Sequence, residues 1–304
     1  MPLTHFICPD GNKCVVKECL TKCRLCGIIN PETGEPWVPC GRCLSRRALL
    51  AVAAERRWTG KPSTTQLLNG TLEEYLKITK PYAVNPMQSV FAIHGTNVHN
   101  GLEENTKGEA LTEERLDDGV STGAFDYFDE EAVPEKDHGY LYDDKTYGSY
   151  KAAKVLGVVK HKRKVGTYKN GKDKFATTYS YDGVKSSGRL DLAIQLNDYR
   201  IKLKKCLNKT ADKMICEMLV RDGNTYIAES RGIFEPAYLV EINKISDHWI
   251  SKYMKAKADN LIKAIDTGQF PKQCSYRERW GGMKCERFCN VKDHCPYFER
   301  STHE

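Results

Sequence analysis

The sequence predicts an α/β fold in which helices flank a mixed central sheet. Amphipathic helical patterns and short aromatic or β-branched runs follow one another in mixed order along the chain. The 304 residues are 40% hydrophobic and 29% charged, a composition typical of soluble globular proteins. The longest apolar run, residues 48–54, is too short to cross a membrane, so no membrane partner is expected. One large core with appendages is the natural expectation for this length.

The cysteines indicate metal ligation rather than disulfides. The opening residues lack the basic-then-apolar pattern of a signal peptide, so we expect a reducing cytoplasm. Of the thirteen cysteines, seven lie within residues 8–43 and four within residues 274–295. Such clusters without an export signal favour bound metal. We expect three segments: a zinc-binding segment with a basic helix (1–60), a catalytic core (61–273) and a cysteine tail (274–304).

Residues 1–44 show little periodicity, so we expect metal rather than a hydrophobic core to hold them together. Two Cys-x-x-Cys pairs have the spacing of a zinc ribbon and predict a Zn²⁺ site. These ligands are Cys23, Cys26, Cys40 and Cys43. Cys8, Cys14 and Cys19 remain, and spacing leaves two roles open for them. They complete a second zinc site with His5, or one of them binds a metal cluster elsewhere.

Capping signals place the first helices. Ser45 is a suitable N-cap for a helix over 46–58. Thr71 and Glu74 have the spacing of a capping box that opens a helix over 71–79. Asn85 before Pro86 predicts the start of the next helix.

The remaining elements follow from periodicity and turn residues. Adjacent strands are expected at 119–131 and 139–147, and a basic hairpin turning at Asn170-Gly171 covers 158–181. Further elements are a short helix at 149–157, a helix at 186–207, a hairpin at 214–230, a strand at 237–242 and a helix at 246–268 ended by Gly268.

Charge is strongly segregated within the net +7. Residues 101–145 hold fifteen acids and four bases, whereas residues 151–174 hold nine bases and one acid. A basic stretch of this kind suits phosphate contacts, which makes Lys160, Lys162, Arg163 and Lys164 candidate DNA-binding residues. A solvated hairpin is the alternative reading.

The stretch "YDDK" (142–145) is the candidate catalytic edge. Alternation along a strand places Asp143 and Lys145 on one face and Asp144 on the other. Phosphodiester cleavage needs a metal ion that stabilises developing charge, and hard divalent ions prefer carboxylate oxygens. Asp126 on the preceding strand is placed to be a second ligand. Taken alone, Asp143 and Lys145 also fit a surface ion pair or a charged turn.

Four short motifs follow one another along the chain: "GTNVH" ending at His99, "GAFD" ending at Asp126, "YDDK", and "QLNDY" with Gln195 and Tyr199. The set resembles the RecB-like branch of the PD-(D/E)XK nucleases over roughly residues 85–205. The resemblance implies a restriction-endonuclease-like core.

The resemblance also implies roles. A Mg²⁺ or Mn²⁺ ion would be bound by His99, Asp126, Asp143 and the main-chain carbonyl of Asp144. Lys145 would serve the attacking water, while Gln195 and Tyr199 would contact DNA or orient the lysine. His94 is equally available as the histidine. Asp191 imitates the "GAFD" acid, but no acid-x-Lys strand follows it, so we place it on the helix with Gln195.

The tail holds Cys274, Cys285, Cys289 and Cys295 in one compact segment. Four thiolates suit either zinc or an iron–sulfur cluster. The tail is similar to that of the CRISPR-associated RecB-family exonucleases, which implies a [4Fe–4S] cluster acting as a structural clasp. The gap of three residues between Cys285 and Cys289 departs from the expected two.

Together these features predict a metal-dependent DNA nuclease, an exonuclease that processes DNA ends or single strands in recombination, repair or phage DNA metabolism. Its partner is DNA, with a protein partner in recombination as a further possibility. Two alternatives stay open. One is a non-catalytic zinc and iron–sulfur module that binds nucleic acid, and the other is an endonuclease of the same chemistry.

Overall fold

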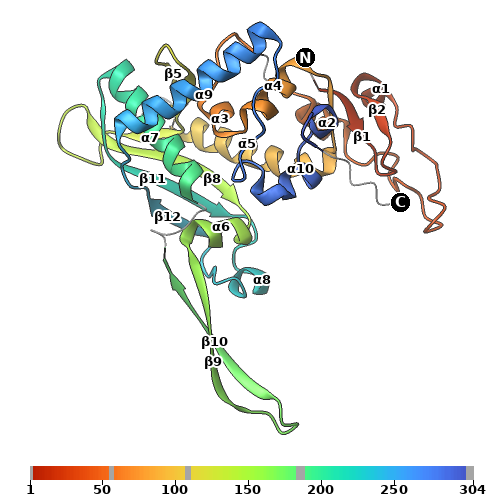
Figure 1. Ribbon diagram of the computed structural model, residues 1–304. Helices are drawn as coiled ribbons and strands as arrows, with labels where there is room; N and C mark the ends of the chain where they lie inside the picture. The colour runs from red at the N-terminus through yellow and green to blue at the C-terminus, as the bar shows by residue number, and fades with distance from the viewer. Residues whose placement is uncertain (1–2, 55–57, 107–110, 183–188, 299–304) are drawn as a thin grey trace. The chain divides into compact units, whose positions relative to one another are not determined.

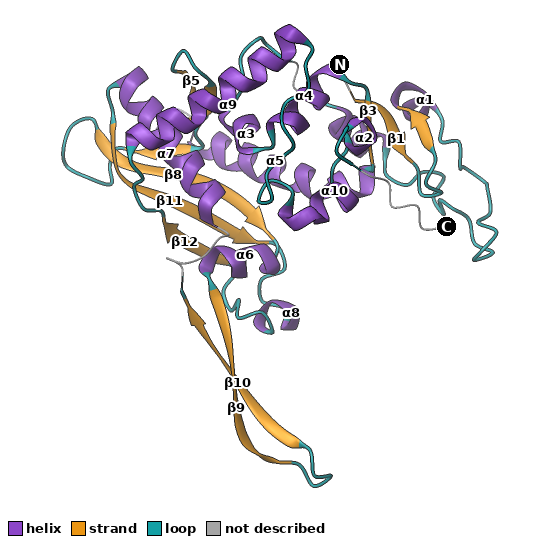
Figure 2. Cartoon of the chain, viewed as in Figure 1, coloured by secondary structure: helices purple, strands orange, loops and turns teal. Residues whose placement is uncertain are grey.

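The protein is described here by a computed structural model covering residues 3–54, 58–106, 111–182 and 189–298 (Figures 1 and 2). The chain forms two compact units. Unit 1 combines Met1–Asn97 with Tyr253–Glu304, and unit 2 comprises Val98–Lys252. Both contain helices and strands, so the predicted α/β class is confirmed. None of the described helices is long and apolar enough to span a bilayer.

This division differs from the expected boundaries at 60 and 273 because the two ends of the chain pack in one unit. Lys13 and Asp293 form an ion pair of 2.9 Å, although 280 residues separate them. Residues of the helix over 71–79, the helix over 247–267 and the tail share one buried cluster that includes Leu72, Leu261 and Val291. The first and last segments therefore belong to the same folded body.

The strands of unit 1 form one sheet in the order β2-β1-β3. The described elements of the unit are β1 (Leu3–Ile7), β2 (Lys13–Val15), α1 (Val16–Thr21), α2 (Arg46–Ala53), α3 (Thr64–Leu68), α4 (Thr71–Thr79), β3 (Tyr82–Val84), the first part of α5 (Pro86–Thr106), most of α9 (Asp247–Thr267), α10 (Met283–Arg287) and 3-10 turns at Trp280–Gly282 and Lys292–His294.

The expectation that residues 1–44 lack a hydrophobic core is wrong. Phe6, Leu25 and Leu49 are buried together in a cluster that also holds Val84 of β3. Strand β1 pairs with β3 in parallel, across about 80 residues of chain, so its partner was invisible to any local pattern. Burial of these side chains supplies cohesion that does not depend on metal.

Two of the predicted helix caps are present and one is wrong. The Ser45 hydroxyl accepts from Ala48 N at 3.2 Å, and Asn85 Oδ1 accepts from Met87 N at 3.0 Å. The predicted capping box at Thr71 does not form, since α4 takes Gly70 as its N-cap and has no side-chain cap. A capping box forms one helix earlier, where Ser63 caps α3 with Gln66. The helix expected at 46–58 is α2, and residues 55–57 lie outside the described residues.

Unit 2 is built on a five-stranded mixed sheet of order β12-β11-β8-β7-β4. Strands β8 and β11 are parallel, and the other pairs are antiparallel. The described elements of this unit are β4 (Leu111–Thr112), β5 (Arg115–Asp117), β6 (Thr122–Ala124), β7 (Tyr127–Asp129), β8 (His138–Tyr147), α6 (Ser149–Leu156), β9 (Val158–Thr167), β10 (Asp173–Tyr181), α7 (Leu190–Leu207), β11 (Thr210–Val220), α8 (Tyr226–Glu229) and β12 (Ala237–Glu241).

Helix α7 covers one face of this sheet (Figure 2). Its residues at helical spacing, Leu192, Leu196, Tyr199 and Leu203, are all buried against sheet residues such as Leu141 and Met214. Asp191 lies on this helix, as expected. The part of the expected helix at 186–188 lies outside the described residues.

Two strand predictions need correction. The strand expected at 119–131 is broken into β6 and β7, which belong to different sheets, because the chain turns at Phe125-Asp126. The hairpin expected at 214–230 is wrong: β11 is followed by the short helix α8, whose N-cap Thr225 accepts from Ala228 N. Strand β11 instead pairs with β8 and β12, so tertiary pairing overrides the local turn signal.

The predicted basic hairpin is present as β9 and β10, which extend away from the sheet as a two-stranded arm (Figure 1). The chain turns at Asn170-Gly171, with Tyr168 N donating to Lys172 O at 2.7 Å. At its base the arm is fixed to the segment after α8, where Tyr179 OH and Tyr181 OH donate to Ser230 O and Gly232 O. Tyr179 therefore fixes the base of the arm to this segment.

Candidate active site and metal centres

The candidate catalytic edge lies on the sheet face that α7 covers. Along β8, Leu141, Asp143 and Lys145 alternate with residues of the opposite face, and their partners on β11 are Met214, Cys216 and Met218. Because Leu141 and Met214 belong to the core beneath α7, Asp143 is carried into the same buried layer. Its carboxylate is completely buried.

Three predicted residues converge at this point. Lys145 Nζ is 2.6 Å from Asp143 Oδ1 and 4.0 Å from Asp126 Oδ2. Asp126 sits in the turn between β6 and β7, and its Oδ2 accepts from the main-chain N–H of Asp144 at 2.6 Å. The turn that breaks the predicted strand is thus what points Asp126 at β8.

His99 joins them from α5. Its Nδ1 lies 3.7 Å from Asp126 Oδ1 and 3.9 Å from Glu113 Oε1. Among the described residues, His99, Glu113 and Asp126 form the one group of three or more His, Cys, Asp or Glu ligands whose ligand atoms all lie within 4.8 Å of one another. His94, the other histidine of the motif region, is exposed and outside this group.

Glu113 was missed by the sequence reasoning. It stands in the connection between β4 and β5 with a positive φ of 50°, and its N–H donates to Asp126 O at 3.2 Å. No motif distinguishes it among the fifteen acids of residues 101–145. The unusual backbone conformation, which a sequence does not display, is what turns it toward His99.

Gln195 and Tyr199 lie beside the Asp143 carboxylate and do not face open solvent. Gln195 Nε2 lies 3.1 Å from both Asp143 Oδ1 and Tyr199 OH. Both residues are buried, one turn apart on α7. Gln195 thus binds the carboxylate that is paired with Lys145, and Tyr199 binds Gln195 in turn.

Asp144 lies apart from the other acids. Its side chain is on the opposite sheet face, with Glu217 of β11 as its lateral neighbour. What it offers toward Lys145 is its main-chain carbonyl, at 3.4 Å from Nζ. The predicted contribution of its backbone to a metal site remains compatible with this placement.

The site carries more negative charge than it can neutralise. Burial raises the pKa of Asp143 to about 6, opposed by Lys145 and reinforced by Asp126. Burial, with Asp126 and Glu217 nearby, raises the pKa of Asp144 to about 7. Burial works against the Lys145 ammonium, but Asp143 and Asp126 raise the pKa of Lys145 further than burial lowers it.

The excess of negative charge is evident at one carboxylate oxygen of the site. Asp143 Oδ2 is buried and accepts no hydrogen bond from any described residue. A buried carboxylate oxygen without a donor is costly unless a cation faces it. The donor set of two aspartates, a glutamate and an imidazole suits Mg²⁺ or Mn²⁺, and the histidine favours Mn²⁺.

The four candidate DNA-binding residues lie on β9 in the arm and are exposed. Lys164 pairs with Asp173 at 2.6 Å, and Lys160 donates to Ser230 O at 3.4 Å near the base. No described acid pairs with Lys162 or Arg163, so these two carry the charge that is available to a phosphate. Strand alternation puts them on opposite faces of the arm.

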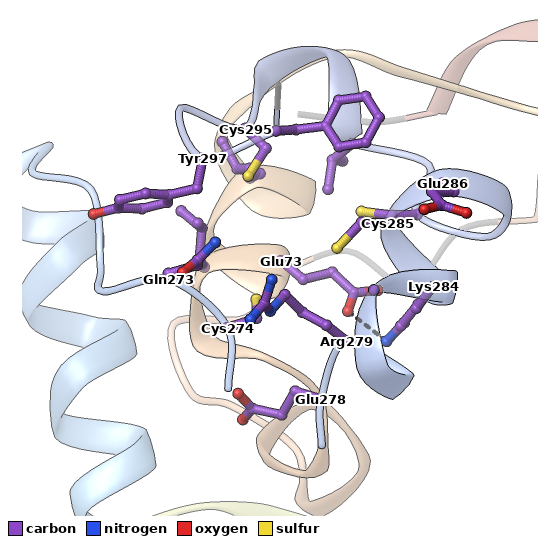
Figure 3. A pocket seen from close by; sticks show the side chains of 16 residues that line it. Glu73, Gln273, Cys274, Glu278, Arg279, Lys284, Cys285, Glu286, Cys295 and Tyr297 are labelled. Carbon is purple, nitrogen blue, oxygen red and sulfur yellow. Dashed lines mark hydrogen bonds and ion pairs between the residues drawn. The ribbon is translucent and has the colours of Figure 1, made fainter. Parts of the chain in front are cut away.

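The tail cysteines line one cavity of about 270 Å³ in unit 1. Figure 3 shows Cys274, Cys285 and Cys295 around it, with Cys289 also in its lining. The ion pair of Lys284 with Glu73, at 2.5 Å, lies at the cavity wall. Gly70 permits the approach of Cys274, because a Cβ at that position would lie 2.3 Å from its Sγ.

The four tail sulfurs are not gathered around a single point. Tetrahedral zinc at 2.3 Å from sulfur needs thiolates about 3.8 Å apart. No hydrogen bond joins any two of the four tail thiols, and no three have their sulfurs within 4.8 Å of one another. The four thiols lie around one cavity, and binding of a [4Fe–4S] cluster or of zinc there remains a prediction.

The ribbon cysteines are less closely gathered. Cys23 is buried and Cys43 half-buried, whereas Cys26 and Cys40 are exposed. The loops approach each other, since a Cβ built on Gly41 would lie 3.5 Å from Cys26 Sγ. Zinc at these four residues remains a prediction. Nearby Arg42 and Arg46 donate to the carbonyls at the end of α1 and so serve the fold.

The chain matches no protein-family model, and no curated protein matches it.

Proposed function

We propose that this protein is a divalent-metal-dependent DNA nuclease of the RecB-like PD-(D/E)XK type, acting on DNA ends or single strands. The observation that carries the proposal is the convergence of Asp126, Asp143 and Lys145, with His99 beside them and Asp143 Oδ2 unpaired. Two acids and a lysine at one buried edge are what hydrolysis of a phosphodiester requires.

His99, Glu113, Asp126 and Asp143 would hold Mg²⁺ or Mn²⁺ together with the Asp144 carbonyl. The bound ion would supply charge neutralisation for the scissile phosphate. Gln195 fixes the orientation of Asp143 through its amide, and Tyr199 fixes Gln195 in turn. Because Asp143 stands on a buried strand and Gln195 and Tyr199 on a buried helix face, this part of the site is preorganised.

Lys145 is the residue that would interact with the attacking water. Its raised pKa keeps it an ammonium at neutral pH, so it donates hydrogen bonds and does not act as a general base. Held 2.6 Å from Asp143, it is positioned to orient the attacking water and to stabilise negative charge on the phosphate.

Two further features support a nucleic-acid substrate. The arm presents Lys162 and Arg163 unpaired, and a strand-shaped polyanion is the partner that an extended basic arm suits. The tail is proposed to hold a [4Fe–4S] cluster that clasps unit 1, and Cys23, Cys26, Cys40 and Cys43 to hold Zn²⁺. Free thiols throughout suit a reducing cytoplasm.

The test is cleavage of closed circular, linear and single-stranded DNA side by side, with Mg²⁺ or Mn²⁺. We expect linear or single-stranded DNA to be degraded, and Lys145→Ala to abolish cleavage while DNA binding persists. Lys213→Ala, a lysine of the neighbouring strand that lies over Tyr140, is the matched control and should cleave normally.

Binding without cleavage by the parent protein under all metal conditions would replace this proposal with a non-catalytic binding module. Cleavage of closed circles as fast as linear DNA would identify an endonuclease of the same chemistry.

A further inference from the structure

Three cysteines outside the zinc ribbon and the tail lie together inside unit 1. Cys8 follows β1, Cys14 belongs to β2 and Cys19 to α1, so three elements bring them to one place. Cys8 Sγ and Cys14 Sγ are 3.3 Å apart, and the Cys19 thiol interacts electrostatically with both. All three are more than nine-tenths buried.

The spacing excludes two ordinary explanations. A disulfide requires about 2.05 Å between sulfurs, and the thiols are free. Apolar packing does not explain why polarisable thiols meet one another when aliphatic neighbours such as Phe6 and Leu49 fill the same core. Sulfurs that share one tetrahedral metal ion stand about 3.8 Å apart, which is close to the contact seen.

The surroundings complement a negatively charged metal–thiolate group. The Arg24 guanidinium, which is held by Asp10, interacts electrostatically with the Cys8 thiol. Arg42 donates to the Cys19 carbonyl at 2.5 Å, at the other end of the row. Two guanidinium groups beside a buried row of thiols offset the charge that deprotonated sulfurs would carry.

We propose that Cys8, Cys14 and Cys19 bind a metal ion, Zn²⁺ by ligand preference, as a site distinct from the predicted ribbon and tail sites. The three sulfurs stand in a row with Cys14 at the centre, so binding requires rotation of the Cys8 or Cys19 side chain toward a common point. The inference does not depend on nuclease activity.

The first experiment counts zinc in the full-length chain by elemental mass spectrometry. Cys14→Ser, which removes the central thiol, should hold about one zinc ion fewer than the parent chain. Cys206→Ser is the control, because that thiol is exposed in unit 2, and its zinc content should not change. Equal zinc in Cys14→Ser and the parent overturns the proposal.

A second measurement needs no variant and so survives a folding failure. The native chain is alkylated with iodoacetamide before and after treatment with a zinc chelator, and labelled peptides are identified by mass spectrometry. We expect Cys8, Cys14 and Cys19 to react only after chelation, whereas Cys206 reacts throughout. A Cys8–Cys14 disulfide in the parent chain, or protection unchanged by chelation, would refute a metal at this position.

Discussion

The two units differ in how much positive charge surrounds a buried carboxylate. In unit 1, Glu73 lies between two lysines, 2.8 Å from Lys77 and 2.5 Å from Lys284. Burial opposes ionisation of this carboxyl, yet the two ammonium groups bring its pKa below the usual value. In unit 2, Asp143 has one lysine for several acids, and its pKa is raised.

The difference separates an acid that stabilises a fold from acids arranged for a ligand. Glu73 is fully compensated by its own chain, so nothing further is required at that position. The Asp143 site has fewer positive than negative groups. Binding of a cation would therefore lower the free energy of the folded protein. The following predictions test that contrast, from the largest expected effect to the smallest.

The largest effect is expected at the active-site acid itself. Asp143→Asn removes a charged ligand and should lower the rate of DNA cleavage by roughly 10³-fold. The control is Asp212→Asn, an acid of β11 that hydrogen-bonds His138 at the far end of the strand. Rates are measured on linear single-stranded DNA with Mn²⁺. A loss of less than tenfold would mean that Asp143 is merely an ion-pair partner of Lys145.

Breaking the compensated acid should damage stability instead. Glu73→Gln leaves the half-buried ammonium groups of Lys77 and Lys284 without their shared carboxylate and should destabilise the protein by about 3 kcal/mol at pH 7. Since the folded pKa is lowered, the ionised carboxylate contributes this stability above the unfolded value of 4.5, and it is lost as pH falls through the folded pKa. Urea unfolding at pH 7 and pH 3 measures the difference.

The matched control for Glu73 is Asp259→Asn, which removes an exposed ion pair with Lys255 in the same unit. Its effect should stay below about 1 kcal/mol. Equal losses in the two variants would show that burial of the Glu73 pairs carries no weight.

Close packing beside Glu73 gives the next effect. Gly70→Ala places a methyl group 2.3 Å from Cys274 Sγ and should destabilise unit 1 by about 2 kcal/mol, with faster proteolysis of the tail. Gly101→Ala, in the open interior of α5, meets nothing within 4 Å and should be neutral or stabilising by up to about 1 kcal/mol. A stable, protease-resistant Gly70→Ala tail would contradict the approach of Cys274.

The smallest effect has the opposite sign. Asp144→Asn removes a buried carboxylate whose pKa is raised to about 7, so the metal-free variant should be more stable than the parent at pH 8, by about 1–2 kcal/mol. The parent loses stability as pH rises from 3.8 toward 7, and below that window the two proteins should unfold alike. Thermal unfolding in a chelator provides the comparison, and a destabilised variant at pH 8 would refute the proposed charge excess.

Local patterns determined much of unit 2. Strand alternation is fixed by backbone geometry, so the common face of Asp143 and Lys145 followed from their spacing alone. Helical spacing likewise identified the buried side of α7, because Leu192, Leu196 and Leu203 must share one face. Turn residues located the arm, and in unit 1 Gly268 ended α9 as expected, with φ of 69°.

Only the tertiary structure decided the rest, because it depends on contacts between distant residues. The parallel pairing of β1 with β3 gives the first segment a core that its own residues do not announce. Glu113 reaches His99 through one positive φ, and Gln195 meets Asp143 across 52 residues of chain. Thiol grouping was likewise set in space: spacing singled out the ribbon pairs, while folding brought Cys8 against Cys14. The residue types thus determine which chemistry is available, and long-range packing determines which of these groups lie close together.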